Sequence, residues 1–211
     1  MKVLRTPEFR EYGRMKVASA TWSARDLNVM FEVDDGRGAV SFWELRFTGV
    51  IDYLLAAISC CGLQISRGRH PAVRQYVDPP VTLRFGAPPE DADRVVGQLW
   101  AAHRRLVDDW IPFDRYLNMK LPLAGLLSSG SGRLATGPGF LLRAYASVLR
   151  RHGCRPGERR LRARRPPRRP LLAHFGEAYV VAEALIVRHS PSDAPVKPTS
   201  RRSPARRRSA S

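Results

Sequence analysis

Cysteine is scarce in this sequence, and the cysteines lack the spacing of disulfide partners or metal ligands. There are three in 211 residues: Cys60 and Cys61 are adjacent, and Cys154 lies far along the chain. An odd number of cysteines without a CxxC spacing indicates neither a disulfide framework nor a zinc site. We therefore expect reduced thiols, no bound metal and a cytoplasmic location.

Long apolar runs are also missing. The most apolar stretch, residues 50–65, contains Asp52 and Gln64 and is 16 residues long, whereas a helix that spans a bilayer needs about 20 mainly apolar residues. The sequence begins MKVLRTPE, which places charges and a proline where an export signal needs an apolar segment. We expect neither a transmembrane segment nor a cleavable signal, and we interpret residues 50–65 as buried core.

Lysine is nearly absent, so arginine carries the positive charge. The chain has 32 arginines and four lysines against 19 acidic residues, a formal net charge of +17. Residues 1–149 carry 19 basic and 15 acidic side chains (+4), and residues 150–211 carry 17 and four (+13). Frequent Arg, Ala, Gly and Pro are typical of a GC-rich coding sequence. The basic C-terminal part is therefore either a selected polyanion-binding segment or a product of codon bias or a shifted reading frame.

Alternation of apolar and polar residues predicts a hairpin early in the chain. Residues 28–33 and 40–48 alternate in this way, and the sequence DDGRG between them supplies Asp-Gly turn chemistry. Val40 and Phe42 have the opposite phase to Trp43. Either both faces are buried there or a β-bulge resets the register.

Four further elements follow from hydrophobic periodicity. Residues 51–61 have apolar side chains at i, i+3, i+4 and i+7, which predicts a short buried helix, and residues 81–85 alternate as a strand does. A helix is predicted for residues 89–110, where one apolar stripe ends before Pro112. Another is predicted for residues 140–152, which end in basic residues followed by a glycine.

The order of these elements predicts an α+β fold. Residues 178–187, AYVVAEALIV, favour a strand over a short helix because of their Val and Ile content. We expect a small, mainly antiparallel sheet covered by two helices, forming one domain over residues 15–188. An Arg/Pro-rich loop is expected at residues 155–170. Residues 189–211 are expected to be a disordered basic tail, because Ser, Pro and Arg offer little apolar area to offset the entropy of ordering.

The Arg-rich stretch is the main candidate site. Residues 155–169 hold eight arginines in fifteen positions, without an aromatic residue for base stacking. Guanidinium groups pair bidentately with phosphate, so this stretch can neutralise a nucleic-acid backbone and release its counterions. The alternative is a solvated loop. The candidate phosphate contacts are Arg155, Arg159, Arg160, Arg162, Arg164, Arg165, Arg168 and Arg169.

A segment of small residues, SSGSGRLATGPG at 128–139, is the alternative candidate. It precedes a predicted helix, whose free N–H groups can hold an anion, but Pro138 and the lack of Lys-Ser/Thr break both nucleotide-loop patterns. The segment is either a flexible connector or a small-ligand loop of an enzyme or binding protein, with Arg133 supplying charge. The residues of that ligand loop are Gly130, Gly132, Arg133 and Gly137.

No complete catalytic constellation is visible in the sequence. The five histidines form no i, i+4 pair, and no serine lies in a Gly-x-Ser-x-Gly elbow. Four aromatic residues near the end of the long helix are expected to pack it on the sheet or, if exposed, to contact a partner: Trp100, Trp110, Phe113 and Tyr116. We therefore expect a soluble, non-enzymatic protein without a cofactor. The functional hypothesis is non-specific association with nucleic acid or another polyanion.

Overall fold

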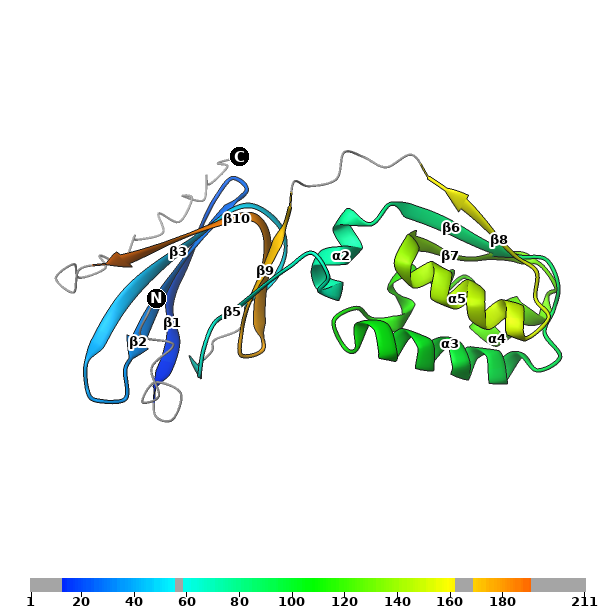
Figure 1. Ribbon diagram of the computed structural model, residues 1–211, viewed down its shortest axis with the longest axis horizontal. Helices are drawn as coiled ribbons and strands as arrows, with labels where there is room; N and C mark the ends of the chain where they lie inside the picture. Colours follow the sequence, from blue (N-terminus) through cyan, green and yellow to red (C-terminus); the bar gives the residue numbers. More distant parts are fainter. Residues whose placement is uncertain (1–12, 56–58, 162–168, 191–211) are drawn as a thin grey trace, which may run out of the picture.

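The computed structural model describes residues 13–55, 59–161 and 169–190. The α+β class is confirmed: a large curled antiparallel sheet lies beside a smaller sheet with helices, and α2 lies between them (Figure 1). The predicted sheet size is wrong, because seven strands join the large sheet, and the described residues contain four α-helices rather than two. None of the helices in the described ranges is long and apolar enough to cross a membrane.

The large sheet forms what we call the large lobe, and its strands follow the order β4-β1-β2-β3-β10-β9-β5. One face is buried because apolar residues alternate along the strands, with Phe31 of β2 meeting Phe175 of β9 edge to face at 5.0 Å. The strands are β1 (Arg14–Ser23), β2 (Asp26–Asp34), β3 (Val40–Leu54), β4 (Ser59–Cys60), β5 (Gln64–Arg67), β9 (Leu171–Phe175) and β10 (Ala178–Ser190).

The predicted hairpin is confirmed as β2 and β3. Its register runs without interruption from Leu27 opposite Phe47 to Asp34 opposite Val40, so no bulge lies between these two strands. Val40 is 47% exposed, which accounts for its opposite phase. The turn is held by the Asp34 carboxylate, which accepts a hydrogen bond from the Gly36 N–H at 2.9 Å.

The helix predicted for residues 51–61 is wrong. β3 continues to Leu54 because β10 pairs with it, placing Tyr179 opposite Leu54 and Val180 opposite Tyr53. Residues 59–60 form β4, and residues 56–58 lie outside the described ranges. A partner strand distant in sequence thus outweighs the helical spacing of the apolar residues. The strand predicted at 178–187 is confirmed as β10.

Residues 71–160, which we call the small lobe, are inserted between two neighbouring strands of the large sheet. The chain leaves after β5 and returns at β9, and these strands pair directly, with Gln64 opposite His174. The small sheet has the order β7-β6-β8. The elements of this part are α2 (Pro71–Val77), β6 (Pro80–Phe85), α3 (Ala92–Val107), the 3₁₀-helix η2 (Phe113–Tyr116), α4 (Leu123–Ser128), β7 (Gly132–Pro138), α5 (Gly139–Arg151) and β8 (Pro156–Arg160).

The predictions for the small lobe are confirmed where periodicity was strong. β6, α3 and α5 match the predicted strand and helices. Two other segments differ: most of the small-residue segment 128–139 is strand β7, and residues 156–160 of the expected Arg/Pro-rich loop are strand β8. Residues 162–168 of that loop and residues 191–211 of the expected tail lie outside the described ranges.

A buried histidine joins three parts of the small lobe. His103 of α3 is 1% exposed, and its Nε2 lies 2.6 Å from the Ile111 carbonyl, which can only accept. Nε2 therefore carries the proton, and the Tyr145 hydroxyl of α5 donates to Nδ1 at 2.7 Å. Burial lowers the pKa of His103, so the ring is neutral in the folded protein near pH 7.

This arrangement predicts a loss of stability in acid. Because the folded-state pKa of His103 lies below its unfolded value, the unfolded chain takes up the proton more readily. We expect the free energy of unfolding to keep its full histidine contribution above pH ~6.5 and to fall as the pH decreases below it. Burial and the nearby His174 lower the pKa of His70 as well, which acts in the same direction.

The variant His103→Gln separates the two histidines. The substitution is expected to lower the free energy of unfolding by about 1–3 kcal/mol near neutral pH, because Tyr145 and Ile111 lose their buried partner. The stability of the variant should also fall less in acid, because only His70 then contributes to the fall. Urea unfolding followed by tryptophan fluorescence over a pH series measures both effects. Parallel pH profiles in the wild type and the variant would exclude His103 as the source.

Candidate functional site

The small sheet has one buried and one open face. Val81, Leu83 and Phe85 of β6 are at most 4% exposed and point toward the side covered by α5. Thr82 and Arg84, at the intervening positions, point to the other side and are half-buried and exposed respectively. The open face is therefore made by the alternate residues of all three strands.

Three arginines and two threonines come together on this open face. Arg84 of β6 lies directly opposite Arg133 of β7, and Arg159 of β8 lies opposite Thr82. Residues that face each other across antiparallel strands share a face, with Cβ atoms about 4.5–5.5 Å apart. Thr136 completes the set, with its hydroxyl 3.3 Å from that of Thr82. We call Thr82, Arg84, Arg133, Thr136 and Arg159 the arginine face.

A β-bulge places Arg133 on this face. The register shifts between Leu83 opposite Ala135 and Arg84 opposite Arg133, so Leu134 is the extra residue of β7. Leu134 and Ala135 are both buried, at 0% and 1% exposure. Without the extra residue, strict alternation would turn Arg133 toward the hydrophobic core of the lobe.

The arginine face carries no carboxylate. Glu158 of β8 has the opposite phase, lying across from Leu83, and it pairs with Arg150 of α5 at 3.8 Å. Among the residues that the structure describes, no ion-pair or hydrogen-bond partner is found for the side chains of Arg84, Arg133 and Arg159. Three like charges thus stand close together in contact with solvent.

The arginines predicted as phosphate contacts are only partly brought together. Arg159 is on the arginine face, while Arg155 precedes β8 and Arg160 has the opposite phase, across from Val81. Arg169 lines a separate, mainly apolar cavity of about 450 Å³ with Arg67. The other predicted contacts lie outside the described residues: Arg162, Arg164, Arg165 and Arg168.

The predicted ligand loop does not form as a loop of converging glycines. Gly130, with φ +86°, makes the turn before β7, Gly132 lies across from Phe85, and Gly137 packs against Tyr116. Arg133 is the only residue of that set on the arginine face. Sequence reasoning missed Arg84: alternation in β6 marks it as outward-facing, but no local signal shows that Arg133 and Arg159 are its neighbours.

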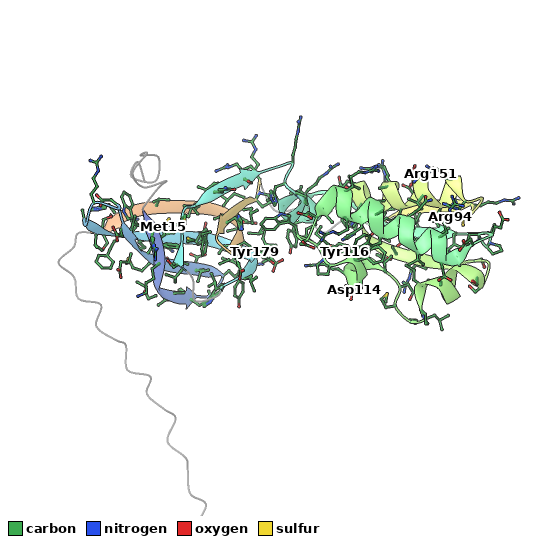
Figure 2. All side chains as sticks on the ribbon, turned by 90° about the horizontal axis from the view of Figure 1, so that it is seen from below. Met15, Arg94, Asp114, Tyr116, Arg151 and Tyr179 are labelled. Carbon is green, nitrogen blue, oxygen red and sulfur yellow. The ribbon has the colours of Figure 1, made fainter. Side chains whose placement is uncertain are left out.

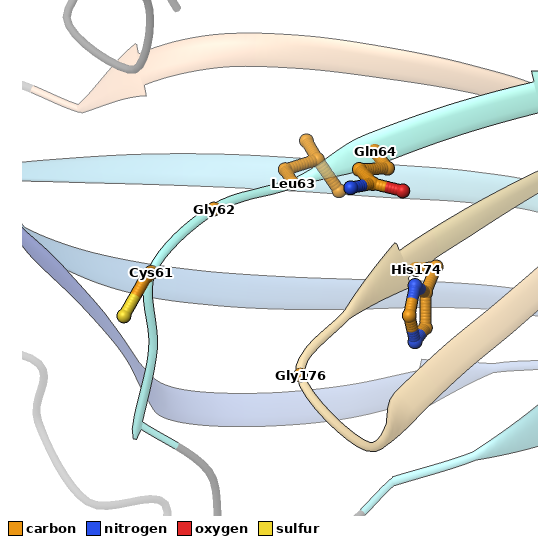
Figure 3. Close-up of a pocket in the computed structure, with 6 residues that line it drawn as sticks. All are labelled: Cys61, Gly62, Leu63, Gln64, His174 and Gly176. Atoms are coloured by element: carbon orange, nitrogen blue, oxygen red, sulfur yellow. The ribbon is translucent and has the colours of Figure 1, made fainter. Parts of the chain in front are cut away.

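A cavity of about 320 Å³ in the large lobe offers no nucleophilic pair. It is lined by Cys61 and His174 among others, and Cys61 is exposed, contrary to the expected burial of the adjacent cysteines. Figure 3 shows the Cys61 sulfur pointing away from the His174 ring. Burial raises the pKa of the Cys60 and Cys154 thiols, which keeps them protonated and unreactive.

A second cleft, of about 400 Å³, lies where the two lobes meet. Its Trp110 packs edge to face on His174 at 5.0 Å, so this part of the predicted aromatic cluster packs against the large sheet, whereas Trp100 is 52% exposed. Arg115 also lines the cleft, but Tyr76 accepts a hydrogen bond from it at 3.3 Å and Asp52 lies 3.9 Å away. These contacts tie the lobes together, and they pair the Arg115 guanidinium with groups of the protein itself.

Comparison with protein-family models, with curated proteins and with solved structures gave no match.

Repulsion within the arginine face predicts a salt effect on stability. Like charges directly opposite each other destabilise a strand pair, so Arg84→Gln and Arg133→Gln are each expected to raise the free energy of unfolding by about 0.5 kcal/mol at low salt. The double variant should gain less than the sum, because either substitution removes the same repulsion. Chemical unfolding of the four proteins gives the coupling energy. It should vanish near 1 M salt, where the Debye length is about 3 Å, and additive effects at low salt would contradict the assigned register.

Proposed function

We propose that the protein binds the phosphate backbone of nucleic acid through the arginine face, without reading base sequence. One observation carries the proposal: Arg84, Arg133 and Arg159 lie on three adjacent strands with no carboxylate among them. Neighbouring strands are about 4.8 Å apart, so the three side chains span about 10 Å of surface. Guanidinium groups over that distance can hold successive phosphates of one strand by charge-assisted hydrogen bonds.

The geometry of the lobe favours backbone contact over base readout. The helices α3 and α5 pack on the buried side of the small sheet, and the open face presents strands with short hydroxyl side chains between the arginines. Reading the major groove requires a helix or a ribbon that enters it. A cationic face made by strands instead touches phosphates, whose arrangement does not depend on sequence.

Binding by this face is expected to weaken with salt. Each neutralised phosphate contributes a slope of about 0.7 for single strands and 0.9 for duplex DNA in a plot of log affinity against log salt. Removing one contact by Arg84→Ala, Arg133→Ala or Arg159→Ala should therefore lower affinity about five- to eightfold at about 0.1 M salt. The slope should become shallower by about 0.7 for single strands and about 0.9 for duplex DNA. Fluorescence anisotropy with a labelled oligonucleotide at several salt concentrations measures both.

Matched controls exist in the same lobe. Figure 2 shows Arg94 and Arg151, which belong to α3 and α5 on the other side of the small sheet. Arg94→Ala and Arg151→Ala remove the same charge from the chain without altering the arginine face. If they weaken binding as much as Arg84→Ala does, the effect comes from net charge and the proposed site is wrong.

The Arg-rich segment is tested by substitution, not deletion. Removing residues 155–170 would delete β8 and leave the edge of β6 unpaired. Replacing Arg162, Arg164, Arg165 and Arg168 together by glutamine keeps β8 and measures their share. An unchanged affinity in this variant, together with losses at the arginine face, assigns binding to the sheet. The reverse result would place it in the segment between β8 and β9.

A further inference from the structure

A hollow adjoins the arginine face at the outer edge of β7. The chain after η2 runs along this strand: Leu117 forms a β-bridge with Ala135, and the Asn118 N–H donates to the Leu134 carbonyl at 2.8 Å. The hollow beside it has a volume of about 180 Å³, and we call it the edge hollow. Its lining residues are Tyr116, Leu117, Asn118, Arg133 and Thr136.

The edge hollow and the arginine face share two side chains. Arg133 and Thr136 line the hollow, and they also lie opposite Arg84 and Thr82 on the open face. A phosphate held between Arg84 and Arg133 is therefore next to the hollow. A group attached to that phosphate through one sugar is within reach of it.

The polar groups of the edge hollow are fixed by bonds to the protein. Asn118 Nδ2 donates to the Arg133 carbonyl at 3.0 Å, and its amide oxygen accepts a hydrogen bond from the Lys120 N–H at 3.4 Å, which leaves that oxygen one lone pair for a ligand. The Tyr116 hydroxyl donates to Gln75 Oε1 at 2.9 Å, which anchors the ring to α2. With the Thr136 hydroxyl, the hollow offers an aromatic ring, an amide oxygen, a hydroxyl and a guanidinium group. Such groups recognise an unpaired base by its face and edges.

Gly137 determines where the aromatic wall stands. A Cβ atom at this position would lie 2.6 Å from Tyr116 Cγ, so the ring packs directly on the backbone of β7. Burial raises the pKa of Tyr116, and the hydroxyl therefore stays protonated as the donor to Gln75. The wall is in place before any ligand arrives, which limits the entropy lost on binding.

We propose that the arginine face binds single-stranded nucleic acid in preference to duplex, with one unpaired base in the edge hollow. The inference rests on the proposed function, because the arginines must first hold the backbone. In a duplex the bases are paired and stacked inside the helix, so only phosphates reach the sheet. In a single strand the base beside a bound phosphate is free to enter.

The test compares probes of equal length on the full chain at one salt concentration. They are a labelled oligothymidine, the same strand annealed to oligodeoxyadenosine, an abasic strand and an oligouridine. We expect the wild type to bind at least one of the single strands about tenfold more tightly than the duplex, and the abasic strand no better than the duplex. The oligouridine shows whether RNA or DNA is preferred. Arginines elsewhere in the chain act on all probes, so the affinity ratios report the hollow.

Asn118→Ala removes the amide without changing charge, and it should lower the ratio of single-strand to duplex affinity toward one. Thr136→Val is the second variant and should lower the same ratio. Arg151→Ala is the control and should leave the ratio of single-strand to duplex affinity unchanged. Thermal unfolding shows whether each variant is folded. Equal wild-type affinity for single strand and duplex, tight binding of the abasic strand, or an unchanged ratio in both folded hollow variants overturns this inference. If Arg84→Ala leaves the affinity for every probe unchanged, the proposed function itself is wrong.

Discussion

The register of β6 against its two neighbours decides what the small lobe presents to solvent. Leu83 is fully buried and Phe85 nearly so, and their burial fixes which face of β6 turns inward. A slip of one residue would move every side chain of a strand to the other face. The hydrophobic core therefore positions Arg84, and the bulge at Leu134 brings Arg133 opposite it without disturbing that core. The candidate site follows from packing on the far side of the sheet.

The parts of the fold that could be predicted are those with a local period. Strand β10 was predicted from its Val and Ile content, whereas the helices α3 and α5 and the strands β2 and β6 show their periodicity in the sequence. β7 does not: its residues, GRLATGP, are small and include a bulge, so they resemble a linker although they form an edge strand of the small sheet. The helix predicted for residues 51–61 was wrong for a different reason: residues 52–54 pair with β10, and no local pattern in the sequence reveals that partner.

The candidate site was visible only in fragments. Arg159 stood out for its arginine neighbours and Arg133 for its small-residue segment, which suggested two competing functions. Strand pairing unites them on one face and adds Arg84, which no motif marks. Asn118 lies in no strand, and it is held beside β7 because the preceding residue, Leu117, forms a β-bridge with Ala135. Such contacts depend on which strands pair, and a single sequence does not contain that choice in readable form.

The structure also bears on the origin of the arginines. β9 and β10 follow the Arg-rich segment, and Phe175 and Val180 within them are fully buried in the core of the large lobe, which argues against a shifted frame before residue 190. Codon bias alone would scatter arginines, and elsewhere in the small lobe several have carboxylate partners. On the arginine face three of them repel one another with no partner among the described residues. Under the proposed function, a ligand rich in phosphate would supply the counterions that turn this repulsion into attraction.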